Sequence, residues 1–576
     1  MNRGRRLECA LRIQKTGPGQ RAGRRDGLMR TFSRFLALGA SITALTFTAS
    51  ALAQQSALSG GVSSPGEPAM EGVVVSAKKD GGIVTVSVIS DDKGRFTFPA
   101  GRLEPGKYTL SIRATGYELD GARTLDIGAA GARQDIKLKK TRNIASQLTN
   151  SEWMQSVPGP DDMRAALLDC QTCHTLERVF RSTYDSDMFT QVLTRMANYA
   201  SESFWLKPQT RPLNRASNPE QFRKMADYIA SFNLSGQEAW AYPLKTLPRV
   251  SGRGTKVIIT EYDLPRRTIQ PHDVVIDKDG VAWYSDFGDQ MIGKFDPKTL
   301  QHTEIRIPLE VPGRPTGSLD LELERDGKLL VGMMNQGAIG QYDPKADKWK
   351  IWEMPPEFNK ENIQLNQVTI NHHVDGKVWT NTNDGTGNVY RLDVNTGKYE
   401  LFQPLKLLPG GPAANAIYQV SPDSQNNGWL AEFRNNYIGR IDAKTGDTKF
   451  YPVPTEKSRN RRGRMDEQDR FWFAQYRGNK VAVFDTKTLE IKEWPMVSPW
   501  SAPYDLVTDK SGDIWSAGMA TDRVTRVNQK TGETIEYQLP RPTNVRRVVV
   551  DDSGAKPVFW TGSNHGASIV KLEPLD

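Results

Sequence analysis

From residue 251 to the C-terminus, hydrophobic and polar positions repeat with a period of about 45 residues. Each repeat combines short β-like runs with one large apolar residue at a matched position. These residues are Trp283, Leu330, Trp379, Trp429, Trp472, Trp515 and Trp560. Most repeats also carry a turn like Asp442–Gly446 and end on a proline. Seven four-stranded units of this length predict a seven-bladed β-propeller over residues 251–576.

The last repeat stops near Leu572 without the outer strand that ends the other six. The run Val257–Pro265, which precedes the first repeat, has the residue pattern of such a strand. A strand from one terminus that completes the last blade would remove an exposed sheet edge. We therefore predict that residues 257–265 close the ring.

Residues 54–141 contain short alternating runs separated by turns rich in glycine and aspartate. The runs are Gly72–Ala77, Val84–Val88, Arg95–Phe98 and Tyr108–Arg113. Alternation at this spacing predicts a small antiparallel β-sandwich.

Residues 142–250 instead have helical periodicity and predict a small α-helical domain. The expected helices are 161–173, capped by Asp161, 186–199, and 219–232, capped by Asn218 with Pro219 in the first turn. The fold class is therefore mainly β, with three domains after residue 53.

The net charge of +9 comes almost entirely from residues 1–53, which hold ten Lys or Arg and two Asp or Glu. The rest of the chain has 66 basic and 65 acidic residues, so nothing indicates a nucleic-acid partner. Met29–Arg34 is basic, residues 35–47 are apolar, and Ala51-Leu52-Ala53 fits a signal-peptidase site. We expect translation to begin at Met29, cleavage before Gln54, a periplasmic or secreted protein, and no membrane span in the mature chain.

The two cysteines of the mature chain lie together in Cys170-Gln171-Thr172-Cys173-His174, the c-type haem attachment pattern. On a helix this spacing lets two thiols reach the two vinyl groups of one porphyrin, and the adjacent histidine can ligate its iron. A zinc site would need a second cysteine pair, and a thioredoxin-like pair would need a βαβ setting. The motif therefore predicts covalent haem c on Cys170, Cys173 and His174.

The helical segment resembles small monohaem cytochromes, in which a methionine follows the motif and a helix like Met225–Phe232 closes the domain. The resemblance implies a methionine as sixth iron ligand. The candidates are Met163, Met188, Met196 and Met225, of which Met196 is favoured. A vacant sixth position stays open.

Matched positions of the repeats predict a polar ring at the propeller mouth, where ligands of propellers usually bind. Its expected members are His272, Asp286, Tyr418, Glu432, Arg461, Tyr504 and Arg546. His272 is a candidate catalytic residue, with a binding or structural role as the alternative, and Asp286 with Glu432 is a candidate site for Mg²⁺. The basic run 459–464 is expected to be a solvated blade edge, with an anion site as the alternative. His372, His373 and His565 are expected to be solvated turn residues.

Two family resemblances add to this picture. Asp92-x-Gly94-x-Phe96-x-Phe98 with Pro105-Gly106-x-Tyr108 resembles the carboxypeptidase regulatory-like domain, which implies a sandwich with a spacer or docking role in a class linked to carbohydrate binding. Pro271-His272, Trp283–Asp286 and Trp429–Glu432 resemble the virginiamycin B (streptogramin) lyase family.

The lyase resemblance implies elimination on a cyclic depsipeptide by a histidine base, matched by His272, and a magnesium ion held by acids, one matched by Asp286. Gln270 stands where a second acid is expected, and other blades lack the pattern. Three interpretations follow. The first is an exported c-type haem protein that transfers electrons, with a propeller that binds a small molecule or a redox partner. The others are a lyase-like enzyme with an ancillary haem and a non-catalytic binding or sensing scaffold.

Overall fold

The computed structural model describes residues 57–576 except 212–217, 235–238 and 370–372. The chain divides into two units at Gln54, and all described residues belong to the second. The expected signal peptide lies outside them, as does His372. Among the described helices none has both the length and the apolar character needed to cross a bilayer.

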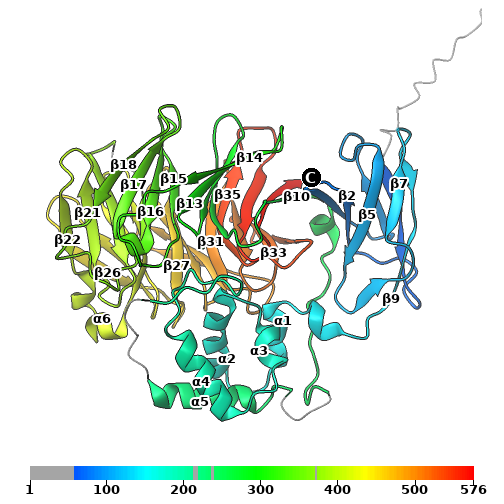
Figure 1. Ribbon diagram of the computed structural model, residues 1–576, viewed down its shortest axis with the longest axis horizontal. Coiled ribbons are helices and arrows are strands. Elements are labelled where there is room, and N and C mark those ends of the chain that lie inside the picture. Colours follow the sequence, from blue (N-terminus) through cyan, green and yellow to red (C-terminus); the bar gives the residue numbers. More distant parts are fainter. Residues whose placement is uncertain (1–56, 212–217, 235–238, 370–372) are drawn as a thin grey trace, which may run out of the picture. The chain divides into compact units, whose positions relative to one another are not determined.

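The repeats fold into the predicted propeller, whose blades fan around a central axis (Figure 1). Within the described residues six blades are separate four-stranded antiparallel sheets. The first three consist of β11 (Pro271–Ile276), β12 (Ala282–Asp286), β13 (Met291–Asp296), β14 (Gln301–Arg306); β15 (Leu321–Leu323), β16 (Leu329–Met333), β17 (Ala338–Asp343), β18 (Lys348–Glu353); and β19 (Leu365–Thr369), β20 (Lys377–Thr382), β21 (Val389–Asp393), β22 (Tyr399–Phe402).

The next three consist of β23 (Ile417–Pro422), β24 (Gly428–Glu432), β25 (Tyr437–Ile441), β26 (Thr448–Pro452); β27 (Asn460–Met465), β28 (Arg470–Gln475), β29 (Lys480–Asp485), β30 (Ile491–Pro495); and β31 (Pro503–Thr508), β32 (Asp513–Gly518), β33 (Arg523–Asn528), β34 (Thr534–Gln538). Short helices η4 (Met334–Gln336), η5 (Pro404–Leu407) and α6 (Gly411–Ala414) lie in the connections.

The seventh blade is closed as the sequence predicts. It contains β35 (Val545–Asp551), β36 (Val558–Ser563) and β37 (Ser568–Pro574), and its outer strand is β10 (Val257–Asp263), which follows η3 (Gly252–Thr255). Strand β10 pairs antiparallel with β37, with Ile259 opposite Leu572. The two ends of the propeller sequence therefore lie side by side in one sheet, and neither leaves a free edge there.

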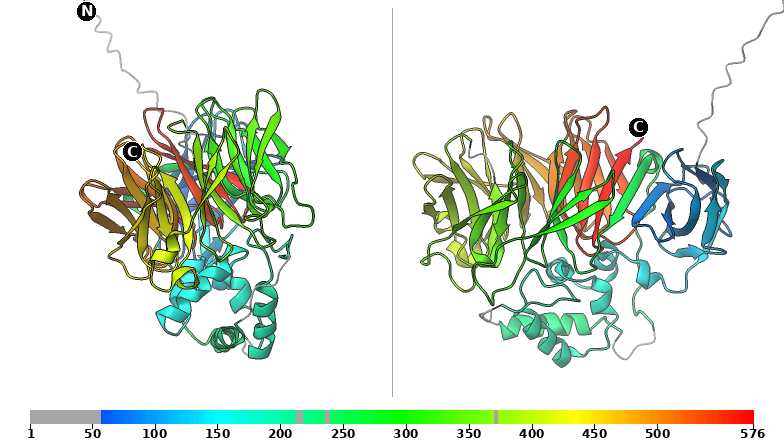
Figure 2. Two further views of the ribbon diagram at one scale, coloured as in Figure 1. Left: turned by 90° about the vertical axis from the view of Figure 1, so that its left-hand side faces the viewer. Right: turned by 45° about the horizontal axis from the view of Figure 1, so that its top comes forward.

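The N-terminal sandwich continues this seventh blade, which the sequence did not indicate. Strand β3 (Val84–Ile89) pairs antiparallel with β10, so one sheet runs β35-β36-β37-β10-β3-β2-β5-β7 (Figures 1 and 2). The other sandwich strands are β1 (Leu58–Ser63), β2 (Val74–Lys79), β4 (Arg95–Phe98), β5 (Gly106–Arg113), β6 (Tyr117–Leu119), β7 (Thr124–Ile127), β8 (Ala132–Arg133) and β9 (Ile136–Lys140). A partly buried ion pair, Arg113–Asp522 at 2.7 Å, also joins the sandwich to the propeller.

The helical segment lies against one end of the propeller (Figures 1 and 2). It comprises η1 (Ile144–Gln147), α1 (Asn150–Ser156), α2 (Asp161–Ala166), η2 (Leu167–Thr172), α3 (Leu176–Phe180), α4 (Ser186–Met196) and α5 (Pro219–Ala230). The predicted helix 161–173 is wrong in detail, because it becomes a short α-helix followed by a 3₁₀ helix, and Pro160 rather than Asp161 is its N-cap. The Asn218 cap of α5 is confirmed by a hydrogen bond from Gln221 N.

Candidate functional site at the propeller mouth

The Cys170–His174 motif lies at the end of η2, with both cysteines free and half-buried. Burial raises the pKa of Cys170 to about 12 and also raises that of Cys173, although Arg546 partly offsets the second shift. Both thiols are therefore protonated at neutral pH. This is not the environment of a reactive thiolate or of a disulfide-exchange pair, in which a lowered pKa is required.

His174 is oriented by the main chain. Its Nδ1 lies 3.0 Å from Thr175 O, and since a carbonyl only accepts, Nδ1 carries the proton. Nε2 is then unprotonated, so its lone pair can accept a hydrogen bond or ligate a metal, and no group of the described chain donates to it. A backbone carbonyl on one ring nitrogen is a common way to hold a histidine that ligates a metal through the other. The residues of the motif therefore fit a c-type haem.

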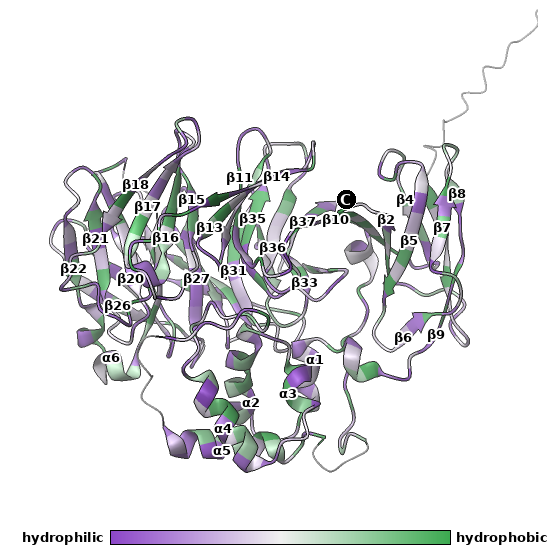
Figure 3. Cartoon of the chain, viewed as in Figure 1, coloured by the Kyte–Doolittle hydropathy of each residue, from purple (hydrophilic) through white to green (hydrophobic). Residues whose placement is uncertain are grey.

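Apolar side chains of the helical segment are unusually exposed, and this is the second feature that fits a bound haem. Met188 and Met196 are 49% and 39% exposed, and Tyr184, Trp205 and Leu206 are similarly uncovered. Met188, Val192 and Met196 are four residues apart, so they share one face of α4. Figure 3 shows this mixture of apolar and hydrophilic positions on α4 and α5. Met225 is instead half-buried against the helical core, and Met163 is half-buried on α2.

Propeller residues bind the main chain of the motif directly. Asn544 Nδ2 donates to Gln171 O at 3.0 Å, and both Arg546 Nη2 and His565 Nε2 donate to Thr172 O, at 3.0 and 3.2 Å. The motif therefore lies on the propeller mouth and is bound there by the seventh blade. His565 is not a solvated turn residue as expected: burial lowers its pKa to about 4, so it is a neutral donor. His373, the other described member of that group, is exposed.

A second contact joins the motif to the fifth blade. Gln171 Nε2 donates to the hydroxyl of Tyr476 at 2.8 Å, and Asp169 pairs with Arg459 at 3.0 Å. Tyr476, Asn544 and His565 were not among the expected site residues. Each lies in or beside a blade-top loop, and only Tyr476 has a sequence signal, as an aromatic residue four positions after a blade tryptophan.

His272 lies below this contact and is fully buried. Its Nδ1 donates to Asp273 Oδ1 at 2.7 Å, so Nε2 accepts from the Tyr504 hydroxyl at 3.2 Å. Burial lowers the pKa of His272 to about 3, which makes the imidazole neutral. Tyr504 is also hydrogen-bonded to Tyr418, and the guanidinium of Arg461 packs 4.4 Å from the Tyr504 ring centroid and 5.0 Å from that of Tyr418.

The structure thus brings together five of the expected mouth residues, His272, Tyr418, Arg461, Tyr504 and Arg546, in one buried cluster. The side chains of His272, Tyr418 and Tyr504 are hydrogen-bonded within the cluster, and Arg546 is bonded to Asn544 and to the motif. Arg461 packs on the aromatic rings and contacts Met519 Sδ, and its buried Nε has no hydrogen-bond partner among the described residues. The cluster is an interface between the propeller and the helical segment, and these five residues do not line an open ligand pocket.

The two expected acids have other partners. Asp286 accepts from Gln270 N and Gly288 N and pairs with Arg266 at 3.1 Å. Glu432 accepts from the backbone N–H groups of residues 416, 434 and 435. Both carboxylates therefore hold blade-top loops. In the part of the chain that the structure describes, no three His, Cys, Asp or Glu side chains gather as a metal-binding group.

Charged residues also fill the channel below the mouth. Arg462 binds Asp273 at 2.9 Å and Asp320 at 3.1 Å, and Arg547 binds the same two acids at 3.0 and 3.3 Å. The expected solvated blade edge at 459–464 is therefore wrong. Arg461 and Arg462 lie in β27, the innermost strand of its blade, and side chains of an inner strand that face the axis are buried whatever their charge.

Comparison with known proteins confirms two of the resemblances over parts of the chain. The virginiamycin B lyase family matches residues 412–574, and the carboxypeptidase regulatory-like domain matches residues 57–139. A search of curated protein sequences finds no match.

Among solved structures, selenomethionine-substituted virginiamycin B lyase from Staphylococcus aureus is 21% identical, with a TM-score of 0.46, over 55% of this chain and 99% of that one. A streptogramin B lyase is 21% identical, with a TM-score of 0.47, over 56% and 99%. The extracellular domain of a hybrid two-component system from B. thetaiotaomicron is 16% identical, with a TM-score of 0.41, over 54% and 41%.

Proposed function

We propose that this is an exported c-type haem protein that transfers single electrons, with its haem-bearing segment fixed on the mouth of a β-propeller. The observation that carries the proposal is the state of His174. Its Nδ1 donates to Thr175 O and its Nε2 has no hydrogen-bond partner among the described residues, while the two cysteines of the same motif are unpaired and protonated. This combination prepares one nitrogen for iron and two sulfurs for thioether bonds.

Cys170 and Cys173 would hold the haem through thioethers, and His174 Nε2 would ligate the iron. Met196 would be the second iron ligand from the chain, with Met188 on the same side of α4 as the alternative. When bound, haem c supplies a reversible one-electron couple whose potential depends on the axial ligands and on burial. The exposed apolar surface of α4 would be covered by the porphyrin.

The propeller in this proposal is a rigid platform. Asn544, Arg546 and His565 bind the motif backbone from the seventh blade. From the fifth blade, Tyr476 binds the Gln171 side chain, and Arg459 pairs with the carboxylate of Asp169, just before the motif. A redox cofactor held on a rigid scaffold keeps its ligand geometry between oxidation states. The partner would be another exported redox protein or a small molecule, and export would follow cleavage before Gln54.

The lyase alternative has less support. His272 would have to act as a base, yet both ring nitrogens are engaged, and the motif covers the mouth above it. Asp286 and Glu432 are bound to backbone N–H groups, which would compete with magnesium. A binding or sensing scaffold is compatible with the same architecture, and a redox titration distinguishes it from an electron carrier.

The test is expression with a cytochrome c maturation system, followed by denaturing gel electrophoresis with haem staining. We expect haem to stay on the denatured chain and to be lost in Cys170→Ala/Cys173→Ala. Thr172→Ala, which changes a residue between the two cysteines and leaves both thiols in place, is the matched control and should retain it. A correctly folded wild-type protein without a Soret band would disprove the proposal. A protein with haem that cannot be reduced and reoxidised would favour the scaffold.

A further inference from the structure

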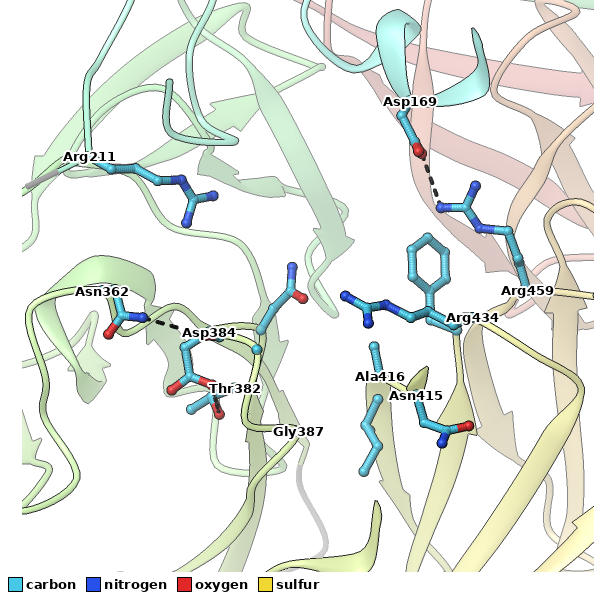
Figure 4. Close-up of a pocket in the computed structure, with 14 residues that line it drawn as sticks. Asp169, Arg211, Asn362, Thr382, Asp384, Gly387, Asn415, Ala416, Arg434 and Arg459 are labelled. Atoms are coloured by element: carbon cyan, nitrogen blue, oxygen red, sulfur yellow. Dashed lines mark hydrogen bonds and ion pairs between the residues drawn. The ribbon is translucent and has the colours of Figure 1, made fainter. Parts of the chain in front are cut away.

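A cavity of about 620 Å³ lies beside the motif, between the helical segment and the mouth of blades three to five. Asp169 borders it from η2, and Arg211 borders it from the connection after α4. The propeller contributes the loop after β20, which includes Asp384, and Arg434 after β24 (Figure 4). Its volume is within the range of small-molecule sites, roughly 300–1,000 Å³.

Two arginines of this cavity have no carboxylate partner at ion-pair distance among the described residues. The guanidinium of Arg211 donates to Tyr199 O at 3.3 Å, and that of Arg434 donates to Ala413 O at 2.8 Å. Figure 4 shows both side chains extending into the cavity from opposite sides. Burial lowers the pKa of Arg211, and Glu202 partly offsets this effect electrostatically. A partly desolvated cation without a close partner is costly unless an anion joins it.

The other charged groups on the wall are already engaged. Arg459 pairs with Asp169, and Asp384 accepts from Thr382 and from the backbone and hydroxyl of Thr386 within its own loop. Asn383 also borders the cavity, and within the described chain its side-chain amide makes no hydrogen bond. The groups that are free to meet a ligand are therefore two guanidinium groups and one amide.

We propose that this cavity binds a carboxylate group between Arg211 and Arg434. The planar fork of a guanidinium matches the two oxygens of a carboxylate, and such charge-assisted hydrogen bonds are stronger than neutral ones. The carboxylate belongs either to a free organic acid, with hydroxyl groups that Asn383 can bind, or to the propionates of a haem attached next to Asp169. The cavity is built from the chain alone, so the first source does not depend on the haem proposal.

The experiment is isothermal titration of the purified full-length holoprotein with sodium glucuronate, and with glucose as the matched neutral sugar. We expect glucuronate to bind and glucose not to bind. Arg211→Gln and Arg434→Gln should each weaken binding about tenfold or more. Arg325→Gln removes the same charge from the exposed turn between β15 and β16 and should leave binding unchanged.

If propionates fill the site, glucuronate will not bind the holoprotein. Arg211→Gln and Arg434→Gln will then lower the midpoint potential, because a lost cation favours the ferric state. Arg325→Gln, which removes the same charge far from the cavity, should leave the midpoint potential unchanged. Equal affinity for glucose, or no glucuronate binding together with an unmoved potential, would overturn the carboxylate site. This second result would not affect the attachment of haem, which the gel assay measures separately.

Discussion

Arg546 of the innermost strand of blade seven donates from Nη2 to the main-chain oxygen of Thr172, 3.0 Å away and 374 residues earlier in the sequence. Thr172 lies between the two cysteines of the motif, and Arg546 is only 3% exposed. This partly buried, charge-assisted hydrogen bond therefore joins the proposed cofactor segment to the propeller at the point where ligands of propellers usually bind.

We expect Arg546→Met to loosen the motif without unfolding the propeller. The variant leaves the Thr172 carbonyl with one donor fewer, a loss on the order of 1–3 kcal/mol. Hydrogen–deuterium exchange of residues 167–176 should become faster, while exchange in β35 and β36 changes little. Lys345→Met, in an exposed turn, is the control. Unchanged protection of the motif would show that the other contacts suffice to hold it.

The sixth ligand gives a spectroscopic prediction. Met196→Ala should abolish the weak sulfur-to-iron charge-transfer band at the red end of the visible spectrum and lower the midpoint potential, since methionine ligation raises it. Met188→Ala, two turns earlier on the same face of α4, is the matched control and should retain the band. If Met188→Ala removes the band and Met196→Ala does not, the two assignments are exchanged.

We expect removal of one arginine from the charged channel to lower the free energy of unfolding strongly. Arg462→Met leaves Asp273 and Asp320 with less compensation in a fully buried site, and such a change typically costs about 3–5 kcal/mol. Urea unfolding followed by tryptophan fluorescence measures it. Arg95→Met breaks an exposed pair with Asp91 and should cost less than about 1 kcal/mol. Similar losses in the two variants would mean that Arg547 alone neutralises both acids.

Strand β10, which completes the seventh blade, could be predicted from the sequence, whereas the ion pairs of the channel could not. Strand β10 was predictable because its alternation is local and the seventh blade lacked one strand. The channel network was not, because Arg462 binds acids 189 and 142 residues away, and only the closed ring brings them together. The pairing of β3 with β10 is likewise a contact between distant segments. Composition indicates that residues 459–464 are basic, and only their place in β27 shows that Arg461 and Arg462 are buried.

The residues of the candidate site likewise include some that local sequence patterns predicted and some that they did not. Local spacing identified Cys170, Cys173 and His174, and the tryptophan register identified five residues that do cluster. Asn544 and His565 were missed because a polar residue in a blade-top loop looks solvated unless the segment that covers it is known. The helical segment precedes the propeller in sequence, and no local pattern places it on the seventh blade.

Asp286 predicts a particular pH dependence of stability. Burial raises its pKa from 3.8 to about 6, so between these values the folded protein binds more protons than the unfolded chain. The free energy of unfolding should therefore fall as pH rises from about 4 to about 6, by up to about 3 kcal/mol. Asp286→Asn keeps an oxygen for the N–H groups of Gln270 and Gly288 and cannot ionise, so its unfolding curve should be flatter over this window. Equal slopes in urea titrations of both proteins would place the pKa of Asp286 near its ordinary value.

The last prediction concerns His272 and the lyase alternative. A general base must reach the proton that it removes, and losing such a base usually costs about 10²–10⁴ in rate. His272 is fully buried, its Nε2 is bound to Tyr504, and the motif lies above it, so a cyclic depsipeptide has no path to this nitrogen.

We therefore expect the wild-type protein, supplied with magnesium, to leave a streptogramin-type lactone intact when the reaction is followed by chromatography. His272→Ala should be equally inactive, and its main effect should be lower stability, because Asp273 and Tyr504 lose a hydrogen-bond partner. Arg546→Met, which loosens the segment above His272, serves as a second test because it should expose any latent activity. Magnesium-dependent lactone opening by the wild type or by Arg546→Met, abolished by the additional change His272→Ala, would show that the propeller is catalytic and that the motif regulates access to its mouth.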